Sequence, residues 1–177
     1  RCSIAAVKAV CEVEAPDGGF DAEGRPRILF EGHKFSAATG GRYDRSHPTL
    51  SYPRWTREHY ARGANTDVRN AGEHGRLQAA ALLDRPAALA SASWGKFQIL
   101  GGNFKAGGFA TLQAFINAMY AGEDAQLKAF VRFVKSERLD DQMRELRWTD
   151  FARRYNGPRY AENNYHGKLA AAYRKYA

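Results

Sequence analysis

Apolar residues recur with the spacing of α-helices over most of the chain. In the first such stretch, residues 4–14, one stripe at 100° per residue is formed by Ile4, Val7, Val10 and Cys11. A proline and two glycines follow within residues 15–19 and end the predicted helix. Glu14 falls inside the apolar stripe at the last turn. One carboxylate is therefore directed toward the apolar side of this helix.

Apolar neighbours and the negative end of the helix dipole both disfavour a charged carboxylate at position 14. We therefore expect the pKa of Glu14 to be raised, which is the property that a general acid needs near neutral pH. Most glutamates at helix ends are solvated, so the pattern alone also allows Glu14 to point into water.

The chain then changes from helical to irregular spacing. In the segment 27–35, the alternation at residues 28–31 predicts a short strand, with Gly32 as a bulge or turn. Residues 36–53 have no helical period and are rich in Gly, Ser, Thr and Pro, which predicts irregular surface or a second small strand pair. A short helical turn is expected at 55–60. A long irregular region of this kind is often functional in a compact domain.

From about residue 67 the pattern is helical almost to the end of the chain. Asp84-Arg85-Pro86 predicts a junction between two helices, and Thr111 predicts a helix cap. Asn156-Gly157-Pro158 predicts a helix stop. Five later helices are expected: one that starts after Thr111, and others at about 123–135, 139–146, 148–155 and 160–176. Their inner faces include Phe115, Ile116, Met119, Phe130, Val131, Val134, Trp148, Phe151, Tyr165, Leu169 and Tyr176. Residues 1–177 are thus expected to form a single, mainly α (α+β) domain of about eight helices, with a small early β-hairpin or sheet.

The charge balance narrows the class of partner. Composition is that of an ordinary globular protein, but the formal net charge of +8 is high for that class. It indicates a polyanionic partner such as nucleic acid, anionic lipid headgroups or bacterial cell wall. Lys and Arg are spread along the chain rather than gathered on one helix face, so nucleic acid is not the expected partner. No stretch approaches the ~20 apolar residues of a membrane span, so stable membrane insertion is not expected.

Cysteine and histidine spacing gives no sign of a crosslink or metal centre. Cys2 and Cys11, if on one helix, lie about 13 Å apart and cannot bridge each other. We therefore expect a disulfide-free protein made in a reducing compartment. The five histidines show no paired spacing typical of zinc, and neither a phosphate loop nor a nucleophile elbow is present. No metal and no cofactor is expected.

Three stretches together carry a resemblance to a known family. They read C-E-V-E-A-P-D-G-G-F with G-R-P-R-I-L-F-E-G-H-K-F, then S-A-S-W-G-K-F-Q-I-L-G-G-N-F, then F-A-R-R-Y-N-G-P-R-Y-A-E-N-N-Y. In this order and spacing, from about Val10 to Tyr173, the chain resembles the N-acetylmuramidase domain of phage endolysins and related bacterial wall hydrolases. The resemblance implies a lysozyme-like fold, a β element flanking the cleft, and cleavage of the β-1,4 bond after N-acetylmuramic acid in peptidoglycan. It further implies a monomer made in the host cytoplasm that acts on the cell wall, in the periplasm of a Gram-negative host.

The resemblance also assigns roles to individual residues. The glutamate that matches Glu14 is the catalytic acid of the family. Glycoside hydrolysis generally needs a second carboxylate, and Glu31 is the candidate because it follows the acid helix on the predicted strand. The alternative for Glu31 is a structural hydrogen bond with His33, Arg27 or a backbone amide. Weaker candidates, on loops, are Asp17, Asp21, Glu23 and Asp44.

Substrate-binding residues are expected in the other two stretches. S-A-S-W-G-K-F-Q-I-L resembles the G-x-x-Q segment of goose-type lysozymes and lytic transglycosylases, with Gly95 making room for the sugar and Gln98 binding an acetamido or hydroxyl group. Trp94 lines the substrate site or belongs to the core. Tyr155-Asn156 resembles the Y-N pair of the same superfamily, whose tyrosine would donate a hydrogen bond to Glu14; the alternative is core packing, with Asn156 as a helix cap.

Three rival functions remain open from the sequence. A lytic transglycosylase also uses one glutamate but needs no water and yields an anhydro sugar. A basic nucleic-acid-binding module would explain the net charge but gives Glu14 no role. A non-catalytic wall-binding domain would keep the cleft without the reaction.

Overall fold

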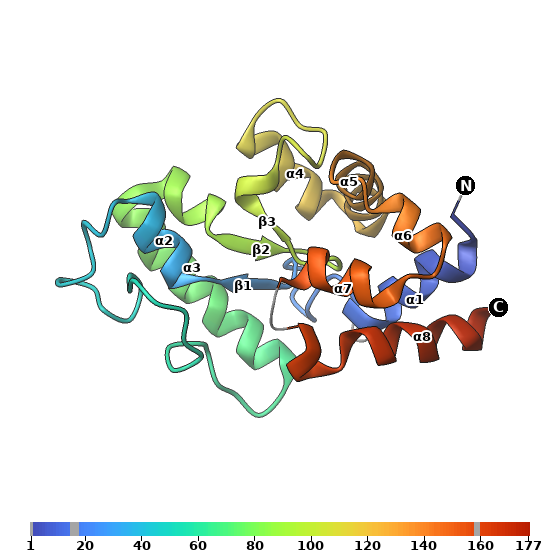
Figure 1. Cartoon of the computed structure of the whole chain (residues 1–177). Helices are drawn as coiled ribbons and strands as arrows, with labels where there is room; N and C mark the ends of the chain where they lie inside the picture. Colours follow the sequence, from blue (N-terminus) through green and yellow to red (C-terminus); the bar gives the residue numbers. More distant parts are fainter. Residues whose placement is uncertain (1, 15–17, 158–159) are drawn as a thin grey trace.

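Helices dominate the structure, a computed structural model that describes residues 2–14, 18–157 and 160–177. The elements follow in the order α1 (Ile4–Glu14), β1 (Ile28–Phe30), α2 (Gly32–Ala38), α3 (Thr66–Ala90), β2 (Ala92–Trp94), β3 (Ile99–Leu100), η1 (Gly101–Asn103), α4 (Leu112–Ala121), α5 (Glu123–Ser136), α6 (Asp140–Arg144), α7 (Trp148–Asn156), η2 (Tyr160–Asn163) and α8 (Tyr165–Tyr176). Over the described part of the chain, eight α-helices and one small antiparallel sheet confirm the expected mainly α architecture (Figure 1).

The sheet joins segments that are far apart in the sequence. Its strands lie in the order β1-β2-β3, with Leu29 opposite Ser93 and Trp94 opposite Ile99. The strand at 28–30 is confirmed. Strands β2 and β3 were not predicted, because they have only three and two residues, too few for a period to be recognised.

Side chains of α3 bind the edge of β1 that β2 leaves open. The Asn70 Oδ1 accepts a hydrogen bond from the Ile28 N–H at 2.8 Å, and the Glu73 Oε2 accepts one from the Phe30 N–H at 3.0 Å. Both polar residues are buried, so these bonds are shielded from water. The strand that leads into Glu31 is therefore fixed on both edges.

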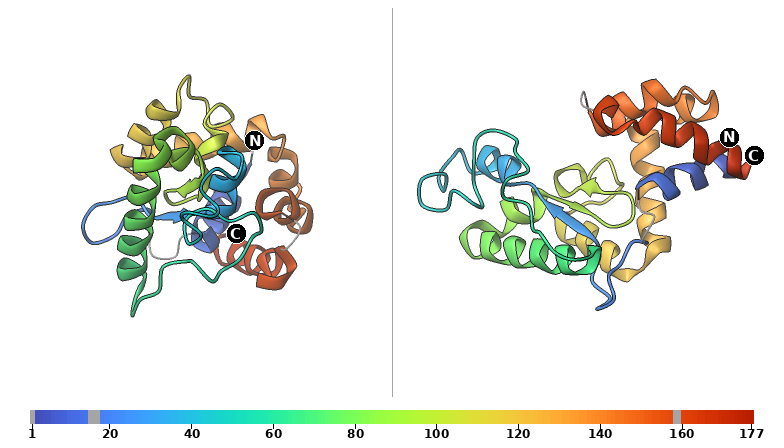
Figure 2. Two further views of the ribbon diagram at one scale, coloured as in Figure 1. Left: turned by 90° about the vertical axis from the view of Figure 1, so that its left-hand side faces the viewer. Right: turned by 90° about the horizontal axis from the view of Figure 1, so that it is seen from below.

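The two ends of the chain lie together. Helices α1 and α8 pack against each other, and α7 packs against α8 (Figure 1). Figure 2 shows both termini at this end, with α2, most of α3 and the long loop 39–65 at the opposite end. The sheet lies between the two ends.

Two helix boundaries that the sequence predicted are confirmed. Thr111 caps α4, because its side chain accepts a hydrogen bond from the Ala114 N–H at 3.1 Å. Helix α3 breaks at Asp84, whose backbone is extended (φ −156°, ψ 95°), just before Pro86. The Asp84 Oδ1 then accepts the Ala87 N–H at 3.0 Å, which caps the helical segment after the break.

The apolar stripe expected for α1 is wrong at Ile4, whose side chain is 76% exposed. Val10 is buried, and Val7 and Cys11 are partly buried against the core, so the rest of the stripe is confirmed. The helix also buries Ala6 and Ala9. The inner faces predicted for α5 and α8 are wrong at one residue each, because the side chains of Val131 and Tyr176 are exposed.

The region after β1 differs in part from its prediction. Gly32 begins helix α2, which continues to Ala38, instead of forming a bulge or turn. Residues 39–53 are irregular, as predicted, and contain no strand. Residues 55–60 form bends and turns rather than a helical turn. A Cβ at Gly32 would lie 2.3 Å from the Tyr52 Cε1, so glycine allows the start of α2 to pack directly beneath that ring.

A continuous apolar core links the helices to the sheet. Its largest fully buried side chains are Trp94, Phe30, Phe35, Phe97, Phe115, Phe130, Phe151, Met119, Leu139, Met143 and Leu169. Cys2 and Cys11 are both free thiols, as expected. Within the described residues, every helix is too short or too polar to cross a membrane.

Candidate active site

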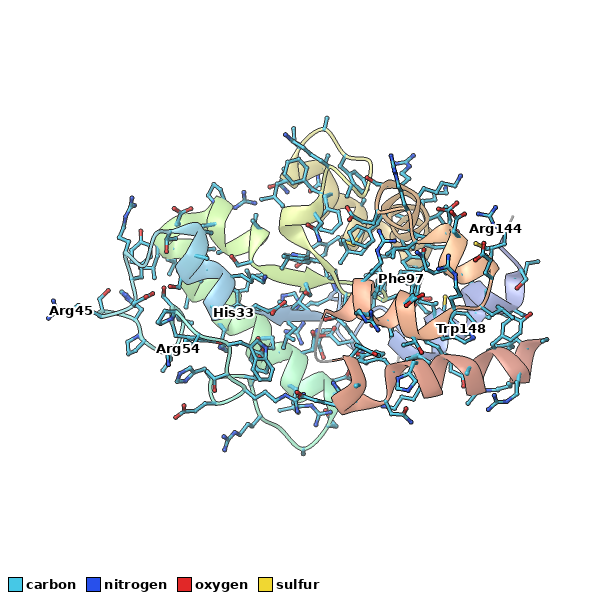
Figure 3. The ribbon with its side chains drawn as sticks, in the orientation of Figure 1. His33, Arg45, Arg54, Phe97, Arg144 and Trp148 are labelled. Carbon is cyan, nitrogen blue, oxygen red and sulfur yellow. The ribbon has the colours of Figure 1, made fainter. Side chains whose placement is uncertain are left out.

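A cleft of about 800 Å³ opens between the sheet and the helices that gather at the chain ends. Glu14 enters it from the end of α1 and Glu31 from the residue between β1 and α2. Figure 3 shows the labelled His33 on the α2 side of this region and Phe97 close to α7. Apolar and aromatic side chains make up much of the wall, including Leu29, Ile99, Leu100, Trp55, Tyr60, Tyr155, Tyr160 and Tyr165. The two predicted carboxylates therefore share one cleft.

Glu14 is half-buried on the cleft wall. Burial, followed by the Glu14 charge, holds the pKa of Tyr155 well above its usual range and raises the pKa of Tyr165 to about 12. Both phenols are therefore uncharged at neutral pH. Glu14 lies beside two neutral aromatic rings in a concave site, and not on a convex surface in bulk solvent.

Glu31 lies in a partly dry part of the cleft. Burial raises the pKa of its carboxyl, while the hydrogen bond from the Ser93 Oγ at 3.1 Å and the charge of Lys34 act in the opposite direction. Its main-chain N–H donates to the Ser91 carbonyl at 3.0 Å, which ties the residue to the start of the β2 segment. The carboxylate thus accepts a structural hydrogen bond, but from Ser93, which was not among the partners that the sequence suggested. A carboxyl with a pKa moved toward neutrality is suited to proton transfer.

His33 contacts Glu31 without forming a full ion pair at neutral pH. The His33 Nε2 lies 3.6 Å from the Glu31 Oε2. Burial and then the charge of Lys34 lower the pKa of the imidazole. A neutral imidazole is therefore the form present at neutral pH, and it leaves the charge of Glu31 largely uncompensated from this side.

Gln98 lies at the cleft, as expected, in a left-handed backbone conformation with φ of 47°. Its Nε2 donates to the Gly95 carbonyl at 2.9 Å and to the Arg27 carbonyl at 3.3 Å. A sugar contact would therefore fall to the amide oxygen. Gly95 also makes room within the protein, because a Cβ there would lie 2.7 Å from the Cδ of the buried Gln126.

The Tyr155 hydroxyl has a different partner from the one expected. It donates to the Phe97 main-chain carbonyl at 2.6 Å, so its one proton is not directed to Glu14. The ring still lines the cleft and stacks on Phe151 with 5.2 Å between centroids. Helix α7 ends at Asn156 as predicted, and the side chain of Asn156 lies outside the described part of the structure.

Trp94 is a core residue, so the prediction that it binds substrate is wrong. It is only 1% exposed, and its Nε1 donates to the Leu89 carbonyl at 3.1 Å. Its position on β2, opposite Ile28, directs the indole away from the cleft, whereas its neighbour Ser93 lines the cleft.

The weaker acidic candidates have structural or solvated positions. Asp21 is buried and binds Arg25 and Asn70, and Asp44 accepts hydrogen bonds from the hydroxyls of Ser36 and Ser51. Glu23 is exposed, and Asp17 lies outside the described residues. Among the side chains that the structure describes, no three His, Cys, Asp or Glu residues are grouped closely enough to hold a metal ion.

Three cleft residues that sequence reasoning missed come from the long loop 39–65. Trp55, Arg57 and Tyr60 all line the cleft. Burial, and after it the charge of Glu31, raises the pKa of Tyr60 far above its usual range. The available signal was the presence of aromatic residues, Trp55 and Tyr60 among them, in an irregular segment where no core-facing period explains them.

Comparisons with known proteins agree with this geometry. The family model Muramidase, described as N-acetylmuramidase, matches residues 3–177. No curated protein matches the chain. Among solved structures, the Burkholderia AP3 phage endolysin is similar at 40% sequence identity with a TM-score of 0.84 over 99% of this chain, which spans 66% of the length of that endolysin. The chain therefore belongs to the N-acetylmuramidase family, as the three stretches of sequence indicated.

Proposed function

We propose that this protein hydrolyses the β-1,4 bond between N-acetylmuramic acid and N-acetylglucosamine in peptidoglycan. The observation that carries the proposal is that Glu14 and Glu31 line the same cleft. Hydrolysis of a glycoside needs an acid for the leaving oxygen and a second carboxylate for the oxocarbenium-like centre or its water. Membership of the N-acetylmuramidase family supports peptidoglycan as the substrate.

Glu14 acts as the general acid in this proposal. Its carboxyl protonates the glycosidic oxygen, and Tyr155 and Tyr165, both uncharged at neutral pH, line the cleft beside it. Glu31 is the second carboxylate, which acts on the oxocarbenium-like centre or on the water that attacks it. Its raised pKa makes it a stronger base than an exposed glutamate, and the Ser93 hydroxyl orients the carboxylate.

The other cleft residues hold the glycan. The Gln98 amide oxygen binds an acetamido or hydroxyl group, and the rings of Trp55, Tyr60 and Tyr155 provide flat apolar contacts for sugar faces. The Tyr155 ring is held by its hydrogen bond to Phe97, so it can offer this surface without moving.

The net charge of +8 supports encounter with the anionic wall. Arg45 and Arg54 are exposed on the loop 39–65, at the end of the molecule far from α8 (Figure 3). The protein acts as a monomer, is made in the host cytoplasm and works on the cell wall, which lies in the periplasm of a Gram-negative host. Activity on whole peptidoglycan should fall as salt rises above physiological strength, and a flat salt response would remove this role for charge.

The test compares Glu14→Gln, Glu31→Gln and the exposed control Glu23→Gln in a turbidity assay on purified peptidoglycan. Loss of a general acid or base costs roughly 10²–10⁴-fold in rate. We expect a loss of that size for the first two variants and wild-type activity for the control. Full activity of Glu14→Gln would refute the proposal.

Mass spectrometry of the products separates the two reactions open to this fold. A hydrolase yields a reducing N-acetylmuramic acid end, whereas a lytic transglycosylase yields an anhydro end. An anhydro product together with an active Glu31→Gln variant would replace hydrolysis by transglycosylation. If the wild type binds peptidoglycan but releases no fragments, the protein is a wall-binding module.

A further inference from the structure

A smaller cavity of about 380 Å³ adjoins the cleft at the catalytic acid. Glu14, Tyr60 and Gln98 line both cavities. The two therefore meet at Glu14, and a group bound in the smaller one lies next to the bond that Glu14 protonates.

The smaller cavity carries a positive charge at its rim. Arg69 lines it from the first turns of α3 and is exposed. The Arg69 Nη1 donates to the Gly63 carbonyl at 3.4 Å, and no salt bridge joins Arg69 to a carboxylate within the described residues. Its charge and most of its donors thus face solvent and the cavity mouth.

Apart from Glu14, which acts in its protonated form in the proposed function, the other charged residues that line the smaller cavity are matched within the protein. Arg27 pairs with Asp67 at 2.9 Å. Glu73 is only 3% exposed, accepts the N–H groups of Phe30 and Ala61, and pairs with Arg76 at 2.8 Å. Arg69 is consequently the group that gives this cavity a preference for an anion.

We propose that the smaller cavity binds the free carboxylates of the stem peptide on N-acetylmuramic acid, and that Arg69 recognises them. This inference rests on the proposed function, because it places the muramic acid residue beside Glu14. The sugar backbone of the wall is neutral, so the peptide substituent supplies the negative charge close to the scissile bond. A guanidinium offers paired N–H groups that match a carboxylate, which a point charge does not. A volume of about 380 Å³ is within the range of sites that hold small ligands.

The test measures Arg69→Gln against wild type on two substrates: intact sacculi, and the same sacculi after a carbodiimide and ammonia have converted the free peptide carboxylates to neutral amides. The matched control is Arg62→Gln, since Arg62 is also exposed but lines neither cavity. We expect the kcat/KM of Arg69→Gln on intact sacculi to fall about tenfold, equivalent to ~1.4 kcal/mol. On amidated sacculi its ratio to wild type should stay within about twofold. The control should match wild type on both substrates.

Two results would overturn the inference while leaving the proposed function in place. An equal loss on both substrates would place Arg69 on the glycan or in the fold, and thermal melting of the variant tells these apart. Unchanged activity on both would mean that Arg69 contacts no substrate. If wild type cleaves neither substrate, the proposed function itself fails, and this inference fails with it.

Discussion

The buried side chain of Gln126 is predicted to hold the turn that presents Gln98 to the cleft. Gln126 is 1% exposed on α5; its Oε1 accepts the Lys96 N–H at 2.7 Å, and its Nε2 donates to the Met119 carbonyl at 2.9 Å. A Cβ at Gly95 would lie within 2.7 Å of its amide. One amide therefore joins the turn after β2 to the end of α4.

The expected loss of stability on replacing Gln126 follows from the two main-chain groups that lose their hydrogen-bond partner. In Gln126→Leu, a main-chain N–H at Lys96 and a carbonyl at Met119 remain without the side-chain bond, and each buried orphan costs ~1–3 kcal/mol. Because Lys96 is partly exposed, water can reach its N–H, and we expect a total loss of about 2–4 kcal/mol in the free energy of unfolding. For a chain of this size that lowers the Tm by roughly 2–4 °C per kcal/mol.

Gln126→Glu gives a second, pH-dependent readout. At neutral pH one carboxylate oxygen would face the Met119 carbonyl, whereas a protonated carboxyl restores a donor there. Burial would raise the folded-state pKa above the unfolded value, so the stabilising contribution is present at low pH and lost as pH rises through the folded pKa. The variant should therefore approach wild-type stability as pH falls toward about 4.

Denaturant unfolding at several pH values measures both variants, with Gln113→Leu as the control. Gln113 is also a helix glutamine with hydrogen bonds to side chains, but it is exposed, so its replacement should change stability by less than ~0.5 kcal/mol. If Gln126→Leu lowers the free energy of unfolding by no more than Gln113→Leu does, Gln126 does not hold the turn. If the loss of stability in Gln126→Glu does not change with pH, the Gln126 side chain does not act as the donor to the Met119 carbonyl.

Three further predictions concern the cleft and its support. Because burial raises the pKa of Glu31, its ionised form costs stability once pH exceeds the folded pKa. Glu31→Gln should therefore have a higher Tm than wild type near pH 7 and the same Tm as wild type at about pH 4. A difference in Tm between variant and wild type that is the same at both pH values would contradict this. Tyr155→Phe should cost ~1 kcal/mol through the lost bond to the Phe97 carbonyl without moving the pKa values of the pH–rate profile; a shifted acidic limb would instead link the hydroxyl to the catalytic acid. Trp94→Phe should lower stability by ~1–3 kcal/mol through the lost bond to the Leu89 carbonyl and the lost volume, with KM unchanged; a raised KM with normal stability would return Trp94 to the substrate site.

The helices could be predicted because their signals are local. Thr111 caps α4 through a bond that spans three residues, and the extended backbone of Asp84 breaks α3 just before a proline. Each of these features depends on neighbours in sequence, so a single sequence contains the information.

The sheet beside the cleft and helix α2 depend on distant contacts, which a local pattern does not contain. Strand β2 forms because Leu29 and its neighbours, far earlier in the chain, pair with it, and its own three residues are too few to show a period. The turn after it requires the amide of Gln126, thirty residues further on. Helix α2 starts at Gly32 because the ring of Tyr52 covers that position. For the same reason, the residues of the loop 39–65 that line the cleft could not be assigned to the site from the sequence.

Glu14 was placed correctly although the reason given for its orientation was wrong in part. Ile4, the first residue of the expected stripe, does not face the interior, yet Ala6, Val10 and Glu14 follow one another at intervals of four residues. Residues at that spacing lie above one another on one side of a helix. The helix ends one turn after Val10, where the protein opens into the cleft. The carboxylate therefore reaches the cavity because Glu14 continues the buried row of Ala6 and Val10 at the end of α1.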